Sequence, residues 1–379
     1  MKQEQISALQ LGVLLFFGIS ATALLSVPNI TGYYAKNDMW ISIIWASSIG
    51  YITTFLTVRL HVLFPDKSII QVAEQVVGKM LGKLIGALYI GYLLVLSGGI
   101  VRTYAEFIIG SFMSKTPIFV VIGTILLVSA YAVFKGIEVI GRAALIILPF
   151  FLLHLLFVPL LGRDMDVSYV LPILGHGVMP SIKGAMPPQA WFGEIILMSF
   201  LLPFLKEQQK AMRVGMMTTF LLMLFLSFLN LFILFIFGHH VEDMEYPVMA
   251  AFSYIRIADF LENMESLVMA IWVVGAFVKI AVFYYILVLA TSQWLDLSSY
   301  KPVVLPSGFL MGLFSVWSLP NMAMLIYFNQ RIFPFYGLCM QTILPGLLLL
   351  LSVVRGRRGR QESQHSSSQD HNQEASNQG

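Results

Sequence analysis

Long apolar runs separated by short polar segments make up most of this chain. A helix that crosses a bilayer needs about 20 mostly apolar residues, and ten runs reach or approach this length. The predicted spans are residues 8–34, 39–60, 81–112, 117–134, 140–161, 183–205, 214–237, 267–294, 303–319 and 333–354. Because the runs are continuous rather than alternating, they favour helices over the strands of a β-barrel. The pattern predicts an all-α membrane protein with about ten transmembrane helices.

Two predicted spans contain residues that interrupt a regular helix. The first has three small residues followed by Pro28, and the sixth begins with two prolines and contains Gly193 and Glu194. Irregular backbone and a carboxylate are tolerated at membrane depth only where they face protein or a cavity. Alone, Pro28 would indicate an ordinary kink, but matching interruptions in the first helix of each five-helix half indicate a binding site near the midplane. The predicted ligand-binding residues are Ala21, Thr22, Ala23, Trp191, Phe192, Gly193 and Glu194.

Composition and charge placement agree with this class of protein. The chain is 58% hydrophobic and 11% charged, whereas a soluble domain has about 25% charged residues. With ten spans, the segments on the side of both termini hold fifteen lysines and arginines, and the opposite segments hold six. Because basic loops stay in the cytoplasm, both termini are predicted to be cytoplasmic.

The connecting segments differ in character. Residues 64–83 have apolar positions at helical spacing, which predicts a short amphipathic helix on the cytoplasmic face. The connection between spans five and six is rich in glycine and proline and predicts an irregular outer lid. The connection between spans seven and eight is acidic, either as solvated loop charge or as a vestibule that attracts a ligand. A ten-helix domain at residues 1–354 is predicted to precede a disordered, basic and polar cytoplasmic tail at residues 355–379.

Four ionisable residues lie inside predicted spans, namely Arg102, Glu106, Glu194 and Lys279. Charges at this depth need partners. Arg102 and Glu106 are four positions apart on one helix, which allows an ion pair that is either purely structural or part of the coupling machinery. Lys279 needs a carboxylate, and both Glu194 and Glu106 are candidates. Arg102, Glu106 and Lys279 are therefore predicted to form ion pairs or to couple ligand binding to helix movement.

No enzyme motif is present in the sequence. It lacks a nucleotide-binding loop, a metalloprotease motif and a serine-hydrolase motif, and its histidines do not cluster at metal-ligand spacing. We therefore predict that the chain is not an enzyme and has no catalytic residue, metal or cofactor. The single cysteine, Cys339, lies in an apolar run and is predicted to be a packing residue.

Several of these motifs resemble known families. The small residues 21–23 followed by Pro28 resemble the unwound first helix of amino acid–polyamine–organocation permeases, and residues 192–194 resemble the equivalent region of their sixth helix. A closer resemblance is to the B-subunit family of bacterial spore germinant receptors. It rests on the Phe-Pro-Asp-Lys-Ser loop with its glycine–lysine pairs at residues 64–83 and on the Trp-Phe-Gly-Glu motif at residues 191–194.

The germinant-receptor resemblance covers about residues 3–355 and implies a LeuT-like fold with two inverted five-helix repeats and broken helices one and six. It implies a receptor in the inner spore membrane that binds a small nutrient, often an amino acid, at this break and triggers germination. Such a receptor works with a membrane-bound A subunit and a lipoprotein C subunit, and not with nucleic acid. Ala21 and Ala23 stand where permeases have glycine, which predicts a stiffer first helix.

Two other functions fit the same sequence. The main alternative is a proton-coupled amino acid permease in which Lys279 or Glu194 carries the proton. A scaffold or ion-conducting subunit without a ligand of its own is a further alternative.

Overall fold

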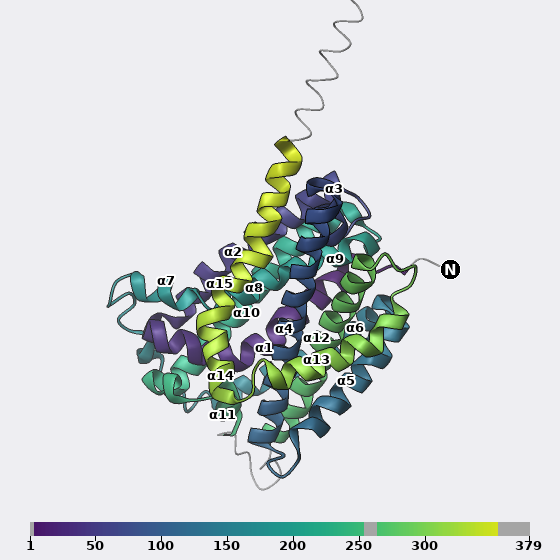
Figure 1. Ribbon diagram of the computed structural model, residues 1–379. Coiled ribbons are helices and arrows are strands. Elements are labelled where there is room, and N and C mark those ends of the chain that lie inside the picture. The colour runs from purple at the N-terminus through teal and green to yellow at the C-terminus, as the bar shows by residue number, and fades with distance from the viewer. Residues whose placement is uncertain (1–3, 254–263, 355–379) are drawn as a thin grey trace, which may run out of the picture.

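The computed structural model describes residues 4–253 and 264–354, which form a bundle of helices with α1 in its interior (Figure 1). The helices are α1 (Ala8–Ala35), α2 (Met39–Leu63), α3 (Ile69–Val77), α4 (Lys79–Ser111), α5 (Ile118–Lys135), α6 (Ile137–Leu153), α7 (Met179–Ala185), α8 (Pro188–Gly193), α9 (Met198–Leu201), α10 (Ala211–Phe237), α11 (Pro247–Ser253), α12 (Met264–Trp294), α13 (Val304–Trp317), α14 (Met322–Tyr327) and α15 (Phe333–Leu338). The β-type pairing in this part of the chain is a single bridge between Ile6 and Leu205. The all-α class is therefore confirmed.

Seven helical runs in the described ranges are long and apolar enough to cross a membrane. The first, Ala8–Leu63, contains both α1 and α2, which are separated only by the short turn η1 (Lys36–Asp38). The shorter α13 and the interrupted segment from α7 to α9 account for the remaining spans, so all ten predicted spans are present. The chain is an integral, multi-pass membrane protein.

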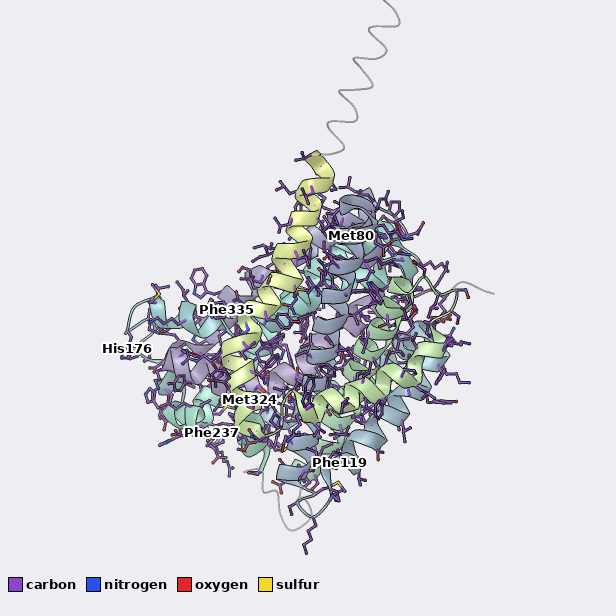
Figure 2. All side chains as sticks on the ribbon, in the orientation of Figure 1. Met80, Phe119, His176, Phe237, Met324 and Phe335 are labelled. Atoms are coloured by element: carbon purple, nitrogen blue, oxygen red, sulfur yellow. The ribbon has the colours of Figure 1, made fainter. Side chains whose placement is uncertain are left out.

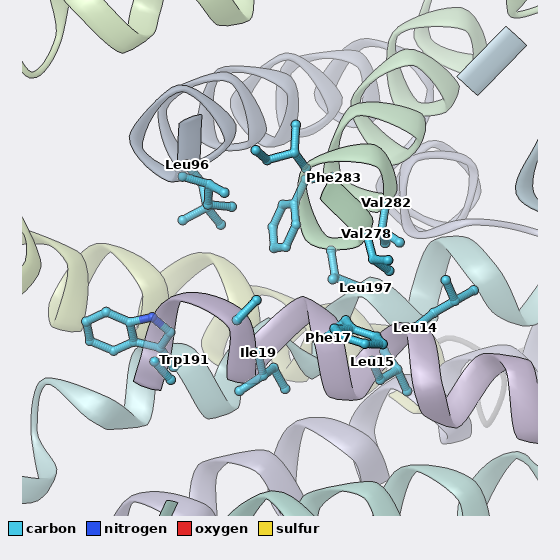
Figure 3. Packing of buried hydrophobic residues seen from close by; sticks show 14 of the residues in the cluster. Leu14, Leu15, Phe17, Ile19, Leu96, Trp191, Leu197, Val278, Val282 and Phe283 are labelled. Atoms are coloured by element: carbon cyan, nitrogen blue, oxygen red, sulfur yellow. The ribbon is translucent and has the colours of Figure 1, made fainter. Parts of the chain in front are cut away.

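Helix α1 is the central element of the bundle. It is apolar around its circumference and mostly buried, as expected for a helix surrounded by other helices. It packs against α10, α12, α7 and α6. Figure 3 shows Leu96 of α4 and Phe283 of α12 facing α1, with Trp191 beside it. Ser7 begins the helix with a capping box, in which its hydroxyl accepts a hydrogen bond from the Gln10 amide.

The outside of the bundle is apolar, as a lipid-facing surface requires. Phe119 and Phe335 are 66% and 63% exposed, and Figure 2 shows Phe119 near the lower edge of the molecule. Cys339 is also exposed, so the prediction that it is a packing residue is wrong. Lipid tails are as apolar as a protein core. An apolar run therefore does not distinguish a packed side chain from one that faces lipid.

The first span is not interrupted as predicted. Helix α1 continues from Ala8 to Ala35 although it contains Pro28. Alanine has the highest helix propensity, so Ala21 and Ala23 favour the helix where glycine would weaken it. Membrane helices tolerate proline where neighbouring helices support them, and Pro28 is buried among the helices that surround α1. Small residues permit a break at this point but do not cause one.

The last span begins earlier than hydropathy predicts. It starts at Met322, where the Asn321 side chain accepts a hydrogen bond from the Met324 amide at 2.9 Å. The helix then passes through polar residues in a π-helical segment, η9 (Phe328–Ile332), before α15. The expected start at residue 333 is wrong because these polar residues lower the hydropathy of a segment that is nevertheless helical.

The described connections between the spans have the character that the sequence predicts. The predicted amphipathic helix is α3, which Ser68 begins with a capping box and which buries Ile69, Ile70, Val72, Ala73 and Val76. Figure 2 places His176 of the irregular lid at the edge of the molecule. The predicted tail, residues 355–379, lies outside the described residues.

Candidate ligand site at the break in the sixth span

The sixth span is broken at the residues that the sequence singles out. Helix α8 ends at Gly193, and Glu194–Leu197 form a 3₁₀ segment, η4, before α9 resumes. A Cβ atom on Gly193 would overlap Oε1 of Gln341, a residue of the last span. Glycine thus allows the Gln341 side chain to pack directly against the backbone of the sixth span, and Glu194 lies in the interior.

Glu194 and Lys279 form a fully buried ion pair. Lys279 Nζ lies 2.8 Å from Glu194 Oε2. Glu194 is 1% exposed and Lys279 is 0% exposed. Lys279 Nζ also donates to Thr22 Oγ1 at 2.7 Å, and Trp191 Nε1 donates to the same oxygen at 3.1 Å. The pair neutralises both charges, and Thr22 connects α1 to α8 and α12.

A small inner cavity lies beside this ion pair. It has a volume of about 20 Å³, and its lining includes Thr22, Trp191, Glu194 and Phe333. A water molecule needs roughly 10–15 Å³ of this kind of space. The inner cavity therefore has room for about one water molecule, and a larger solute requires the surrounding helices to separate.

A larger vestibule adjoins the inner cavity. It has a volume of about 320 Å³ and shares Ser26, Thr103 and Asn329 with the inner cavity. Its lining also contains acidic residues from the connection after α10, including Glu242 and Glu245. The inner cavity is thus the deep end of a wider, acidic opening.

The mouth of the vestibule is tied to α1. The Asn29 side-chain amide donates to the carbonyl oxygens of Glu242 and Met244 at 2.9 and 2.6 Å. Glu242 also forms an ion pair with Lys36. Burial and the nearby Glu245 carboxylate raise the pKa of Tyr246, so this phenol in the lining stays neutral. Carboxylates therefore provide the charge of the mouth.

The N-terminal segment bonds α1 to the far end of the sixth span. The Ile6 amide donates to the Phe204 carbonyl at 2.9 Å, and the Lys206 amide donates to the Ile6 carbonyl at 3.0 Å. The Ala8 amide donates to Glu207 Oε2 at 2.8 Å. We call residues 4–8 the N-terminal clamp, because these bonds hold the start of α1 against residues 204–207.

Glu4 extends the clamp to two further elements. Its carboxylate accepts hydrogen bonds from the Ile137 amide at 2.9 Å and from the Tyr300 hydroxyl at 3.2 Å. The Tyr285 hydroxyl lies 3.4 Å from the same group. The first residues of α6 and the last part of α12 are thereby joined to the N-terminus. The clamp therefore lies at the start of α1, whereas the vestibule opens beside residues 242–246, which are bonded to Asn29 near the other end of this helix.

The predicted binding residues divide between the cavity and its support. Thr22, Trp191 and Glu194 line the inner cavity. The Ala21 carbonyl accepts a hydrogen bond from the Tyr104 hydroxyl, which ties α1 to α4. The other three predicted residues, Ala23, Phe192 and Gly193, are buried in packing contacts and do not line it.

Arg102 and Glu106 form an ion pair within α4, with Arg102 Nε 2.8 Å from Glu106 Oε1. Arg102 also donates to the Pro320 carbonyl at 2.9 Å, which ties α4 to the segment before the last span. Neither residue lines the inner cavity. Their geometry is that of a brace between two spans.

Sequence reasoning missed the residues that both cavities share. Ser26 lies between Thr22 and Pro28 in the first span, and Thr103 follows Arg102 in the third, but nothing in their spacing indicates a shared cavity. Asn329 belongs to a polar triplet that hydropathy assigns to a loop. The π-helical segment places Asn329 at the junction of the two cavities.

Comparison with known proteins gives the family and the fold. The family model described as spore germination protein matches residues 5–323. Spore germination protein KB of Bacillus subtilis (strain 168) is 24% identical over 367 residues, which cover 94% of this chain and 97% of that protein. Spore germination protein YndE of the same organism is 23% identical over 361 residues, 93% of this chain and 98% of that protein.

Two solved transporters share the fold. The structure of MhsT in complex with L-phenylalanine has a TM-score of 0.67 at 10% identity, covering 93% of this chain and 96% of that chain. The structure of Mhp1, a nucleobase-cation-symport-1 family transporter, has a TM-score of 0.66 at 13% identity, covering 92% and 78%. The predicted LeuT-like fold is confirmed in its architecture. The chain belongs to the spore germination protein family, the family of germinant-receptor B subunits.

Proposed function

We propose that this chain is the ligand-binding subunit of a nutrient germinant receptor, and that its ligand is a small molecule, an amino acid or a similar compound. The observation that carries the proposal is the buried Glu194–Lys279–Thr22 cluster at the deep end of the vestibule. A buried ion pair costs desolvation free energy and is weak evidence for stability alone. A polar cluster at the end of an open vestibule is suited to bind a polar solute.

The small inner cavity provides a route from binding to signalling. About 20 Å³ does not hold an amino acid, so a ligand that reaches Glu194 must separate α8 and η4 from α1. Both Lys279 and Trp191 donate to Thr22, so this separation breaks or rearranges bonds between three spans. The ammonium or carboxylate group of a ligand would replace one member of the ion pair. Binding is thereby linked to a change in helix arrangement.

The setting of this receptor is also part of the proposal. We infer that the protein lies in the inner spore membrane with both termini in the cytoplasm, alongside an A subunit and a lipoprotein C subunit. The family membership and the basic bias of the predicted cytoplasmic segments support this arrangement. The ligand-induced change would be passed to these subunits and would start germination.

The test is a germination dose–response in spores whose only copy of this chain carries Glu194→Gln. Glutamine keeps the shape and one acceptor oxygen but removes the charge. We expect a response that is shifted to much higher nutrient concentration or lost, while the protein remains detectable in the membrane by immunoblotting. Glu106→Gln is the matched control, because Glu106 is an ionisable residue of a span that does not line the inner cavity. An unchanged dose–response in Glu194→Gln spores would refute the role of this site.

A proton-coupled amino acid permease is the second candidate, favoured by the same ion pair and by the fold. It predicts uptake of radiolabelled nutrient by the purified chain in proteoliposomes when a proton gradient is imposed. The receptor proposal predicts binding without net uptake. Uptake that depends on both the gradient and Glu194 would decide for the permease.

A further inference from the structure

A long groove runs along the outer surface of the bundle between α1, α6 and α10. Its volume is about 740 Å³. Its apolar walls include Leu9, Leu152, Met217 and Leu221, which are 66%, 36%, 47% and 50% exposed. Because these side chains face outward on membrane-spanning helices, the groove is open to lipid.

One end of the groove is charged. Glu207, Lys210 and Arg213 line it there, next to Ser7 and Ala8 at the start of α1. Glu207 accepts the Ala8 amide at 2.8 Å and lies 3.7 Å from Lys210 Nζ. Arg213 is exposed and has no hydrogen bond or ion pair with any described residue. Lys210 and Arg213 carry two positive charges and Glu207 one negative charge, so this end of the groove is positive. The Arg213 guanidinium is free to bind an anion.

We propose that this groove is a binding site for an anionic phospholipid. The head-group phosphate would lie against Arg213 and Lys210, and an acyl chain would lie along Leu9 and Leu221. A basic pocket between membrane helices, close to where they leave the bilayer, is the arrangement that recognises anionic head groups. Arginine suits phosphate in particular, because its planar fork can donate two parallel hydrogen bonds.

A second groove on the same molecule lacks the charged end. It lies between α5 and α13, has a volume of about 590 Å³, and has Leu127, Leu305 and Leu313 among its lining residues. None of its lining residues is Asp, Glu, Lys or Arg. It should hold acyl chains without selecting a head group, so it is an internal control for the proposal.

The proposed lipid site is separate from the ligand site. The groove shares no lining residue with the inner cavity or the vestibule. Its lining does include Ser7 and Ala8 of the N-terminal clamp, and also Glu207, which accepts the Ala8 amide. A bound phospholipid would therefore contact the segment that holds α1 to the end of the sixth span.

The experiment uses a photo-crosslinking amino acid at Leu221 of the full chain, reconstituted in vesicles of phosphatidylcholine with a minor fraction of phosphatidylglycerol. Mass spectrometry of the adducts gives the head group that was captured. We expect phosphatidylglycerol at Leu221 to be enriched above its share of the vesicle, and lipids at Leu313 to match the vesicle composition. Removing Lys210 and Arg213 as Lys210→Gln and Arg213→Gln should reduce the enrichment about fivefold for each cation.

Arg59→Gln is the matched control, because Arg59 is an exposed basic residue that does not line the groove. It should leave the enrichment unchanged. The proposal is overturned if Leu221 captures lipids in the vesicle proportions, or if the enrichment survives loss of both groove cations. It is also overturned if Leu221 in the assembled receptor captures a protein partner instead of lipid.

Discussion

Replacing one member of the buried Glu194–Lys279 pair should destabilise the protein more than replacing both. The pair is separated by 2.8 Å and excluded from water, so each single change leaves a charge without its partner. Removing one partner of a buried pair costs about 3–5 kcal/mol. A stranded group can instead lose its charge, and the free energy of that proton transfer sets an upper limit on the part of the cost that comes from the unpaired charge.

The limit follows from the reference pKa values. In Lys279→Met, protonating a carboxyl group with a reference pKa of about 4.3 at pH 7 costs about 3.7 kcal/mol. In Glu194→Gln, deprotonating an amine with a reference pKa of about 10.4 at pH 7 costs about 4.6 kcal/mol. The double variant has no stranded charge and loses hydrogen bonds worth about 1–3 kcal/mol, so it should be more stable than either single variant.

The pH dependence of the two single variants should be opposite. Protonating the stranded carboxyl costs less as pH falls, so this part of the loss in Lys279→Met should shrink to about 1 kcal/mol at pH 5. Deprotonating the stranded amine costs less as pH rises, so this part of the loss in Glu194→Gln should shrink to about 2 kcal/mol at pH 9. Each loss is taken relative to the unsubstituted protein at the same pH.

The assay is thermal unfolding of the purified variants in detergent at these pH values. For a chain of 379 residues the shift is about 1.3 °C per kcal/mol, so each single variant should melt about 5–6 °C below the unsubstituted protein at pH 7. Additive losses in the double variant, or the same pH trend in both single variants, would refute the argument that the two charges stabilise each other.

Three further predictions test other parts of the structure. In Gly193→Ala the new methyl would overlap Gln341 Oε1, so stability should fall by about 1–3 kcal/mol, and Gln341→Ala should relieve this; no relief in the double variant would contradict the contact. Glu4→Ala removes the acceptor for the α6 amide, so the amides of residues 6 and 206 should exchange faster with deuterated water, whereas unchanged exchange would mean that the clamp does not depend on this carboxylate. Single cysteines at the exposed Lys67 and Asp243, in an otherwise cysteine-free chain, should react with an impermeant maleimide from opposite sides of the membrane, and labelling of both from one side would exclude the ten-span topology.

The spans and the break in the sixth span can be predicted from the sequence because each depends on local properties. Length and continuous hydropathy are sufficient for a membrane helix, and two prolines with a glycine disfavour a regular helix wherever they lie. The need of Glu194 for a partner also follows from its depth alone. The serine at position 68 and the apolar spacing after it likewise indicate a helix at α3, because a capping residue and an amphipathic pattern are both local features.

Tertiary packing decided the features that depend on neighbouring helices. Lys279 pairs with Glu194 rather than Glu106 because its position on α12 lies beside the break in the sixth span. Glu106 instead forms an ion pair with Arg102 on α4. The same packing leaves α1 continuous through Pro28, since the surrounding helices support the turn that the sequence pattern marks as weak. Asn329 joins the cavity lining only because a π-helical segment carries the last span through its polar residues. Hydropathy describes how a residue partitions between water and lipid, whereas these contacts depend on which surfaces of the ten spans pack together.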